Sequence, residues 1–289
     1  MKVAIAQISP ALGESRRNLT LHLDRAARAR RAGADLVVFP ELSLTGYLLL
    51  DLAHDLALDL RRASEVKRLA AASAKIAILA GLVEETPEFR FHNTAALFEA
   101  GRLAHRHRKV YLPTYGMFDE GRYFAPGDRF RVHASPKLGR IGVLVCEDAW
   151  HPSSAYVLAQ GGVDLICIIS AGPVRGVGTP EGVASRTAWR DLCRAIAQFN
   201  TVYVVYCNRV GHEDGWTYSG GSLAVDPLGE VIAESGREGE DLLLVDVRPE
   251  RLREARIQLP LLRDERAHLV RRELGRVLRR RAADPGDPA

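Results

Sequence analysis

Three ionisable side chains, Glu41, Lys109 and Cys146, each follow a stretch that is predicted to be a strand. Side chains at the carboxyl ends of strands in an α/β sheet commonly form functional sites. A thiol becomes a nucleophile when a base takes its proton, and Glu41 is the candidate base. The ammonium group of Lys109 would stabilise the oxyanion that forms when sulfur attacks a carbonyl. Together the three residues predict acyl transfer through a cysteine.

Each of these residues also has a structural alternative. A single cysteine is often a small core side chain, a glutamate after a strand is often paired or caps a helix, and a lysine there is often solvated. A cysteine–histidine pair is a further possibility, because His151 follows Cys146 closely. Catalytic histidines normally come from elsewhere in a fold, so we expect His151 to be a solvated residue in the first turn of a helix.

Composition narrows the possible functions. The chain has 289 residues, enough for one large domain or two small ones. Its formal net charge is only +4, and the arginines are dispersed, which argues against a nucleic-acid partner. No apolar run is long enough to cross a membrane, and residues 2–8 are predicted to form a strand and not a signal peptide. We therefore expect a cytoplasmic protein without a membrane partner.

The four cysteines are Cys146, Cys167, Cys193 and Cys207, and no two of them form a CxxC pair. This spacing argues against a zinc site and against a disulfide framework. We expect the last three to be packed in the core or on a helix. Neither a metal nor a cofactor is predicted.

Strands and helices alternate along the chain, without a linker that would divide it. Strands are predicted at 2–8, 36–39, 76–83, 92–98, 103–108, 138–145, 164–169 and 202–206, followed by a late β meander over 222–245. Helices are predicted at 14–31, 58–74, 149–160, 182–199 and 263–281. Two batches of strands separated by helices favour two sheets packed face to face with helices outside, a four-layer α-β-β-α sandwich. A single doubly wound sheet is the main alternative.

A long irregular segment, residues 109–124, follows Lys109 and is rich in aromatic residues and glycine. Loops of this length in a compact domain usually have a function.

Three segments resemble the nitrilase, or carbon–nitrogen hydrolase, superfamily: residues 39–47 (FPELSLTGY), 109–113 (KVYLP) and 145–150 (VCEDAW). The resemblance implies the four-layer sandwich and assigns Glu41 as general base and acid, Lys109 as oxyanion stabiliser and Cys146 as nucleophile. It also implies that Glu120 is the family's second glutamate, which orients the lysine or the substrate. On this basis residues 1–262 form a carbon–nitrogen hydrolase domain, and residues 263–289 form a basic helix and a frayed tail.

Within the superfamily, residues 112–124 and 146–150 are most similar to the glutamine-hydrolysing domain of glutamine-dependent NAD synthetases. That likeness implies a substrate pocket bounded by Tyr115, Phe118 and Glu147. A serine and a basic residue of those domains are replaced by Gly172 and Gly178. Arg175 could substitute for the missing basic group.

The predicted function is a cofactor-free amidase that cleaves a small linear amide through a thioester and releases ammonia or an amine. The first alternative is a detached glutaminase subunit that supplies ammonia to a separate synthetase. The second is a catalytically silent binding module. The resemblance also implies a homodimer. Leu269, Leu274 and Leu278 lie on the basic C-terminal helix, and we expect this helix to pack on a second subunit or back across its own, because an isolated helix of this kind does not stay ordered alone.

Overall fold

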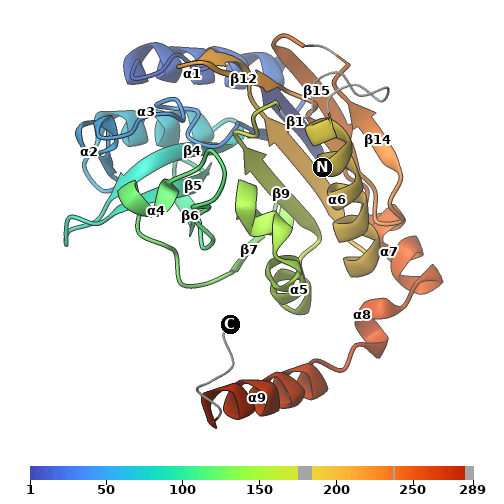
Figure 1. Ribbon diagram of the computed structural model, residues 1–289. Helices are drawn as coiled ribbons and strands as arrows, with labels where there is room; N and C mark the ends of the chain where they lie inside the picture. Colours follow the sequence, from blue (N-terminus) through green and yellow to red (C-terminus); the bar gives the residue numbers. More distant parts are fainter. Residues whose placement is uncertain (175–183, 237, 284–289) are drawn as a thin grey trace.

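Two mixed β-sheets pack face to face between two layers of helices (Figure 1). The structure is a computed structural model and describes residues 1–174, 184–236 and 238–283. The first sheet has the order β15-β1-β2-β4-β5-β6, and β3 pairs with β4 beside this path. Its strands are β1 (Lys2–Gln7), β2 (Leu36–Val38), β3 (Leu58–Asp59), β4 (Ala77–Glu85), β5 (Phe91–Glu99), β6 (Arg102–Arg108) and β15 (Asp241–Asp246).

The second sheet has the order β14-β13-β10-β9-β8-β7, and its central strands β8, β9 and β10 run parallel. Its strands are β7 (Val132–Ser135), β8 (Gly139–Val145), β9 (Leu165–Ser170), β10 (Tyr203–Asn208), β13 (Leu223–Val225) and β14 (Val231–Glu234). Because the strands divide into two sheets, the doubly wound single sheet is excluded and the four-layer sandwich is confirmed.

Alternation along β1 shows how the layers are held together. Val3 and Ile5 are buried in the core that includes both sheets, whereas Ala4 and Ala6 are buried with the helices α1 (Ser15–Arg31) and α3 (Ser64–Ser73). This is the two-residue period of a strand that is covered on both faces. Beyond the second sheet, α5 (Pro152–Gln160) and α6 (Ala184–Asn200) form the opposite helical layer.

Several predicted elements differ from the structure. The late meander is correct for β13 and β14, which pair antiparallel, but wrong for its last strand, because β15 leaves the second sheet and pairs antiparallel with β1 of the first. The helix predicted from residue 58 begins at Ser64, since Leu58 and Asp59 pair with β4 instead. The helix predicted from residue 149 begins at Pro152, where a proline is favoured in the first turn, and Cys146–Trp150 form a separate 3-10 turn.

Several short elements were not predicted from the sequence. They are α2 (Leu52–Asp55), α4 (Glu120–Tyr123), the hairpin of β11 (Val210–Glu213) and β12 (Trp216–Ser219), and α7 (Pro249–Gln258). The segment 109–124 is irregular as predicted, apart from the single turn α4.

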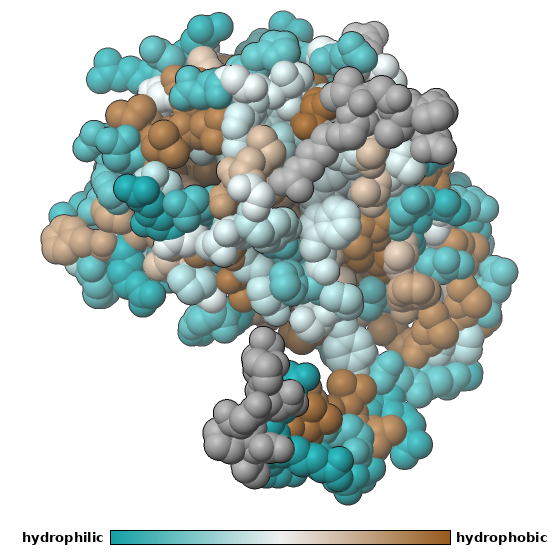
Figure 2. Space-filling view, in the orientation of Figure 1, coloured by the Kyte–Doolittle hydropathy of each residue, from teal (hydrophilic) through white to brown (hydrophobic). Residues whose placement is uncertain are grey.

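The C-terminal part of the chain lies apart from the sandwich (Figure 1). After α8 (Leu261–Asp264), α9 (Ala267–Ala283) extends away from the other elements and contains no buried residue among its described side chains. Figure 2 shows apolar side chains among hydrophilic ones on this helix. The predicted boundary after residue 262 stays a prediction.

Across the described residues, no helix is both long enough and apolar enough to span a membrane.

Candidate active site

The structure brings Glu41, Lys109 and Glu120 into direct contact. Lys109 Nζ lies 2.8 Å from Glu41 Oε1 and 2.6 Å from Glu120 Oε1, and it donates a hydrogen bond to each. All three side chains are buried. Glu41 follows β2 and Lys109 follows β6, so the strand ends of the first sheet position two of the three groups, and α4 positions the third.

Glu41 depends on a close approach between two backbone segments. A Cβ atom on Gly81 of β4 would lie 2.3 Å from Leu42 N and 2.5 Å from Pro40 O. Only glycine leaves room for the chain around Glu41 to lie against β4 at this distance. Gly81 O also accepts a hydrogen bond from Leu44 N at 3.0 Å, which holds the loop after Glu41.

Cys146 lies at a sharp turn after β8. Its φ is 45°, a left-handed conformation that is strained for a residue with a side chain and that often occurs at active sites. The residue is 9% exposed, and Ser170 Oγ at the end of β9 donates to Cys146 Sγ at 3.3 Å. The second sheet thus places the thiol at the carboxyl ends of two adjacent parallel strands.

Burial and charge determine the protonation states of the cluster. Burial, reinforced by the negative charge of Glu41, raises the pKa of the Cys146 thiol well above its usual value. Burial lowers the pKa of Lys109, but the carboxylates of Glu120 and Glu41 outweigh it and hold that pKa well above the ordinary range. Burial raises the pKa of Glu120 to about 7 against the opposing charge of Lys109. The resting cysteine is therefore a neutral thiol that needs a base, and Lys109 is a cation.

The Lys109 ammonium group can still bind a ligand atom. An ammonium group has three donor hydrogens, and two of them point to Glu41 and Glu120. The third can stabilise an oxyanion without breaking either ion pair.

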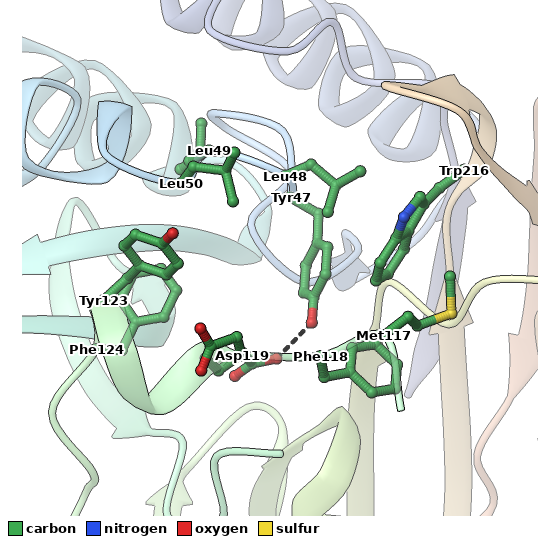
Figure 3. Close-up of a pocket in the computed structure, with 11 residues that line it drawn as sticks. Tyr47, Leu48, Leu49, Leu50, Met117, Phe118, Asp119, Tyr123, Phe124 and Trp216 are labelled. Carbon is green, nitrogen blue, oxygen red and sulfur yellow. Dashed lines mark hydrogen bonds between the residues drawn. The ribbon is translucent and has the colours of Figure 1, made fainter. Parts of the chain in front are cut away.

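Three residues that sequence reasoning missed support the two glutamates. Asn93 Nδ2 donates to Glu41 Oε1 at 2.7 Å, and the Ala171 backbone N–H donates to Glu41 Oε2 at 2.8 Å. Tyr47 OH donates to Glu120 Oε1 at 2.6 Å (Figure 3). Asn93 is a polar residue within the buried strand β5, a pattern that could have singled it out.

Asp148, also missed, ties the turn of Cys146 to the segment after Lys109. Its carboxylate accepts the backbone N–H groups of Val145 at 3.0 Å, Val110 at 2.9 Å and Tyr111 at 3.0 Å. His107 Nε2 lies 2.7 Å from Asp148 Oδ2. One fully buried side chain thus fixes the relative position of the nucleophile's strand and the lysine's strand.

The β11–β12 hairpin positions Tyr47. Glu213 Oε1 accepts the backbone N–H groups of Tyr47 at 2.7 Å and Leu48 at 2.5 Å. Arg209, which is fully buried, pairs with the other oxygen of Glu213. Trp216 of the same hairpin packs on the Tyr47 ring at 6.0 Å between centroids.

Cys146 opens into a cavity of about 390 Å³. The predicted substrate residues Tyr115, Phe118 and Glu147 line it, and Tyr115 OH donates to Glu147 Oε1 and Oε2 at 3.0 Å each. The cavity is otherwise lined by Trp150, Gly172, Pro173, Ala184, Ser185, Ala188 and Trp189. Arg175 and Gly178 fall outside the described residues.

His151 does not replace Glu41 as the partner of the thiol. Its ring stacks on Tyr111 with centroids 3.5 Å apart, and its Nε2 lies 3.9 Å from Glu147 Oε1. Part of the side chain is exposed, in agreement with a solvated histidine before α5.

A family model described as carbon–nitrogen hydrolase matches residues 2–257. The chain is 34% identical over 253 residues to a glutamine-dependent NAD(+) synthetase from Thermotoga maritima, covering 86% of this chain but 42% of that protein. It is 32% identical over 271 residues to an (R)-stereoselective amidase from Pseudomonas, covering 93% of both. The chain thus spans less than half the length of the synthetase and nearly all of the amidase.

Solved structures agree with this assignment. A carbon–nitrogen hydrolase from Helicobacter pylori has a TM-score of 0.85 at 27% identity and covers 95% of this chain and 98% of that one. An amidase from Nesterenkonia, with acrylamide added at its active-site cysteine, has a TM-score of 0.76 at 28% identity. The match covers 94% of this chain and 99% of that one. The chain belongs to the carbon–nitrogen hydrolase family, and the prediction of an enzyme that acts on carbon–nitrogen bonds is confirmed.

Proposed function

We propose that this protein is an amidase in which Cys146 is the nucleophile, Glu41 the general base and acid, Lys109 the oxyanion stabiliser and Glu120 the group that holds the lysine. The observation that carries the proposal is the buried contact of Lys109 with Glu41 and Glu120 beside a neutral, strained cysteine. The acrylamide adduct on the active-site cysteine of the Nesterenkonia amidase supports the role of Cys146.

Glu41 takes the Cys146 proton as sulfur bonds to the carbonyl carbon, and Lys109 donates to the resulting oxyanion. The oxyanion then collapses and the carbon–nitrogen bond breaks. Glu41 transfers its proton to the departing nitrogen, which leaves ammonia or an amine and a thioester. Water then attacks the thioester as Glu41 accepts its proton, and the acid is released as the thiol regains that proton.

The cavity favours an amide that carries an ammonium group. Glu147 is the charged residue among its described lining residues, and the indoles of Trp150 and Trp189 contact each other edge to face at 5.3 Å between centroids. A carboxylate beside aromatic rings attracts a cation. A Cβ atom on Gly172 would lie 3.1 Å from Trp189 Nε1, so a serine at this position would require the indole to shift.

The second candidate is a glutaminase subunit that supplies ammonia to a separate synthetase. The likeness to the Thermotoga synthetase over 86% of this chain favours it. Glutamine would need a cation for its α-carboxylate, and Arg175 is the candidate for that contact.

Steady-state ammonia release from glutamine, 4-aminobutanamide and butanamide tests the proposal. We expect kcat/KM to be highest for 4-aminobutanamide, and Glu147→Gln to raise KM for that amide without changing KM for neutral butanamide. A preference for glutamine of about a hundredfold, lost in Arg175→Ala through a higher KM, would establish the glutaminase instead. If none of the amides releases ammonia, the protein is instead the catalytically silent binding module.

A further inference from the structure

A cavity of about 200 Å³ lies between β6, the edge strand of the first sheet, and the segment 128–131 that leads into β7. Its described lining consists mostly of arginines: Arg106, His107, Arg108, Asp128, Arg129 and Arg131. Among the described residues, none is shared with the cavity of Cys146. Pockets for whole drug-sized ligands measure roughly 300–1,000 Å³, so this cavity suits a small charged group.

The arginines from β6 share a single carboxylate. Glu84, which is buried, accepts hydrogen bonds from Arg108 Nε at 2.9 Å and from Arg108 Nη2 at 2.7 Å. Arg106 Nη1 lies 2.9 Å from Glu84 Oε1. The other carboxylate, Asp128, is paired with its neighbour Arg129, whose Nε donates to Asp128 Oδ1 at 2.7 Å.

Arg131 adds a cation without a counter-ion, because it is exposed and makes no ion pair with another described residue. Four arginines therefore surround the cavity against the two carboxylates of Glu84 and Asp128. The side chains of Arg106, Arg108 and Arg129 are 49%, 27% and 55% exposed, so a solute can reach them. A guanidinium group that contacts one carboxylate still has N–H donors for a second anion.

The cavity also adjoins the active site along the chain. Arg108 directly precedes Lys109, and His107 Nε2 lies 2.7 Å from Asp148 Oδ2. Lys109 N–H donates to Asn93 O of β5, so the alternation along the strand directs the Arg106 N–H to the free edge of β6. An anion bound here would restrain the end of β6 and should raise the unfolding temperature.

We propose that this cavity binds the phosphate group of a small molecule, either free phosphate or a phosphate monoester. A guanidinium plane presents paired N–H donors that match two oxygens of a phosphate. The arginines form a compact group and not a long stripe, which favours a small anion over a nucleic acid. The proposal does not depend on the amidase function, since the cavity is separate from that of Cys146.

Isothermal titration of the full-length protein with inorganic phosphate, phenyl phosphate and acetate tests the proposal. Ionic strength is held constant, because salt screens exposed charges. Arg131→Gln and Arg106→Gln each remove one cation from the cavity. Arg102→Gln is the matched control, because it removes the same charge from an exposed position at the other end of β6, outside the cavity.

We expect phosphate to bind the wild type at least about tenfold more tightly than acetate. Binding should weaken about tenfold in Arg131→Gln and in Arg106→Gln and stay unchanged in Arg102→Gln. Tighter binding of phenyl phosphate than of phosphate would identify a monoester as the occupant, and the reverse order would identify the free anion.

Equal weakening by Arg102→Gln would show a general effect of charge and overturn the proposal. Binding of phosphate no tighter than that of acetate, or wild-type affinity in Arg131→Gln, would also overturn it. If Arg106→Gln does not fold, Arg131→Gln gives the same test, because Arg131 has no ion pair to lose among the described residues.

Discussion

Among single residues, Cys146 differs from the other three cysteines in its access to a ligand. It lines a cavity and receives a hydrogen bond from Ser170, whereas Cys167, Cys193 and Cys207 are fully buried. Burial raises the pKa of Cys167 to about 12 and also raises that of Cys193. No carboxylate contributes to the pKa of either thiol. Reactivity should therefore be confined to Cys146, where Glu41 can accept the proton.

We expect iodoacetamide to label Cys146 before the other cysteines in the native protein, as peptide mass spectrometry would show. Cys146→Ser should abolish ammonia release while leaving the thermal unfolding temperature near that of the wild type, because the hydroxyl is a poorer nucleophile and fits the same turn. Equal labelling of Cys193 or Cys207 would contradict this assignment.

Glu120 should make stability depend on pH. Its pKa is about 7 in the folded protein against 4.5 for an unperturbed glutamate. Between these values the folded chain keeps a proton that the unfolded chain has lost, so the folded state loses relative stability as pH rises through this window. The loss is on the order of 3 kcal/mol for a shift of this size.

The variant Glu120→Gln cannot ionise, so it should not show this loss. We expect the stability of this variant relative to the wild type, measured by urea denaturation, to be greater at pH 8 than at pH 5. Asp119→Asn, the exposed neighbour, is the control and should follow the wild-type curve. Parallel curves for Glu120→Gln and the wild type would show that Glu120 does not titrate in this range.

Among the elements, the contact between strand β8 and the segment after β6 depends on one side chain. Asp148 accepts backbone hydrogens from both, so it holds Cys146 and Lys109 in register. Asp148→Asn replaces one acceptor oxygen with a donor that faces an N–H group or His107. We expect a loss of about 3 kcal/mol in unfolding free energy, the cost of unsatisfied buried polar groups.

The same substitution should lower kcat more than it raises KM, because it moves the nucleophile and the lysine relative to each other. Asp128→Asn is a matched control, since Asp128 is exposed and its ion pair is with its neighbour Arg129 on the surface. That control should leave stability and activity nearly unchanged. Wild-type kinetics in Asp148→Asn would show that the turn after β8 is held by other contacts.

The sequence predicts those parts of the fold and site that depend on neighbouring residues. The apolar runs that became β2, β8 and β9 were recognisable, and so were Glu41, Lys109 and Cys146 at or next to strand ends. The pairing of β15 with β1 was not, because the choice of a distant strand leaves no local pattern. For the same reason the pairing of Asn93 with Glu41, and of Glu213 with Tyr47, could not be predicted, although a polar residue within a buried strand could have singled out Asn93 itself.

At the scale of the whole molecule, α9 lies apart from the sandwich and has no buried residue among its described side chains. It carries Val270, Leu274, Val277 and Leu278 exposed on one side, and arginines cover much of the rest. Burying a side chain of this size contributes about 1.5–3 kcal/mol, so burying all four against a partner surface would strongly favour association. Because the helix extends away from its own sandwich, a second copy of the chain is the partner we expect.

Multi-angle light scattering at micromolar concentration should therefore show a dimer. The double variant Leu274→Arg and Leu278→Arg places charges on the apolar side of α9 and should give a monomer with an unchanged unfolding temperature for the sandwich. Arg272→Ala, on the charged side of the helix, is the control and should remain dimeric. A monomeric wild type would refute the dimer, and a dimer that survives the double variant would place the interface elsewhere on the molecule.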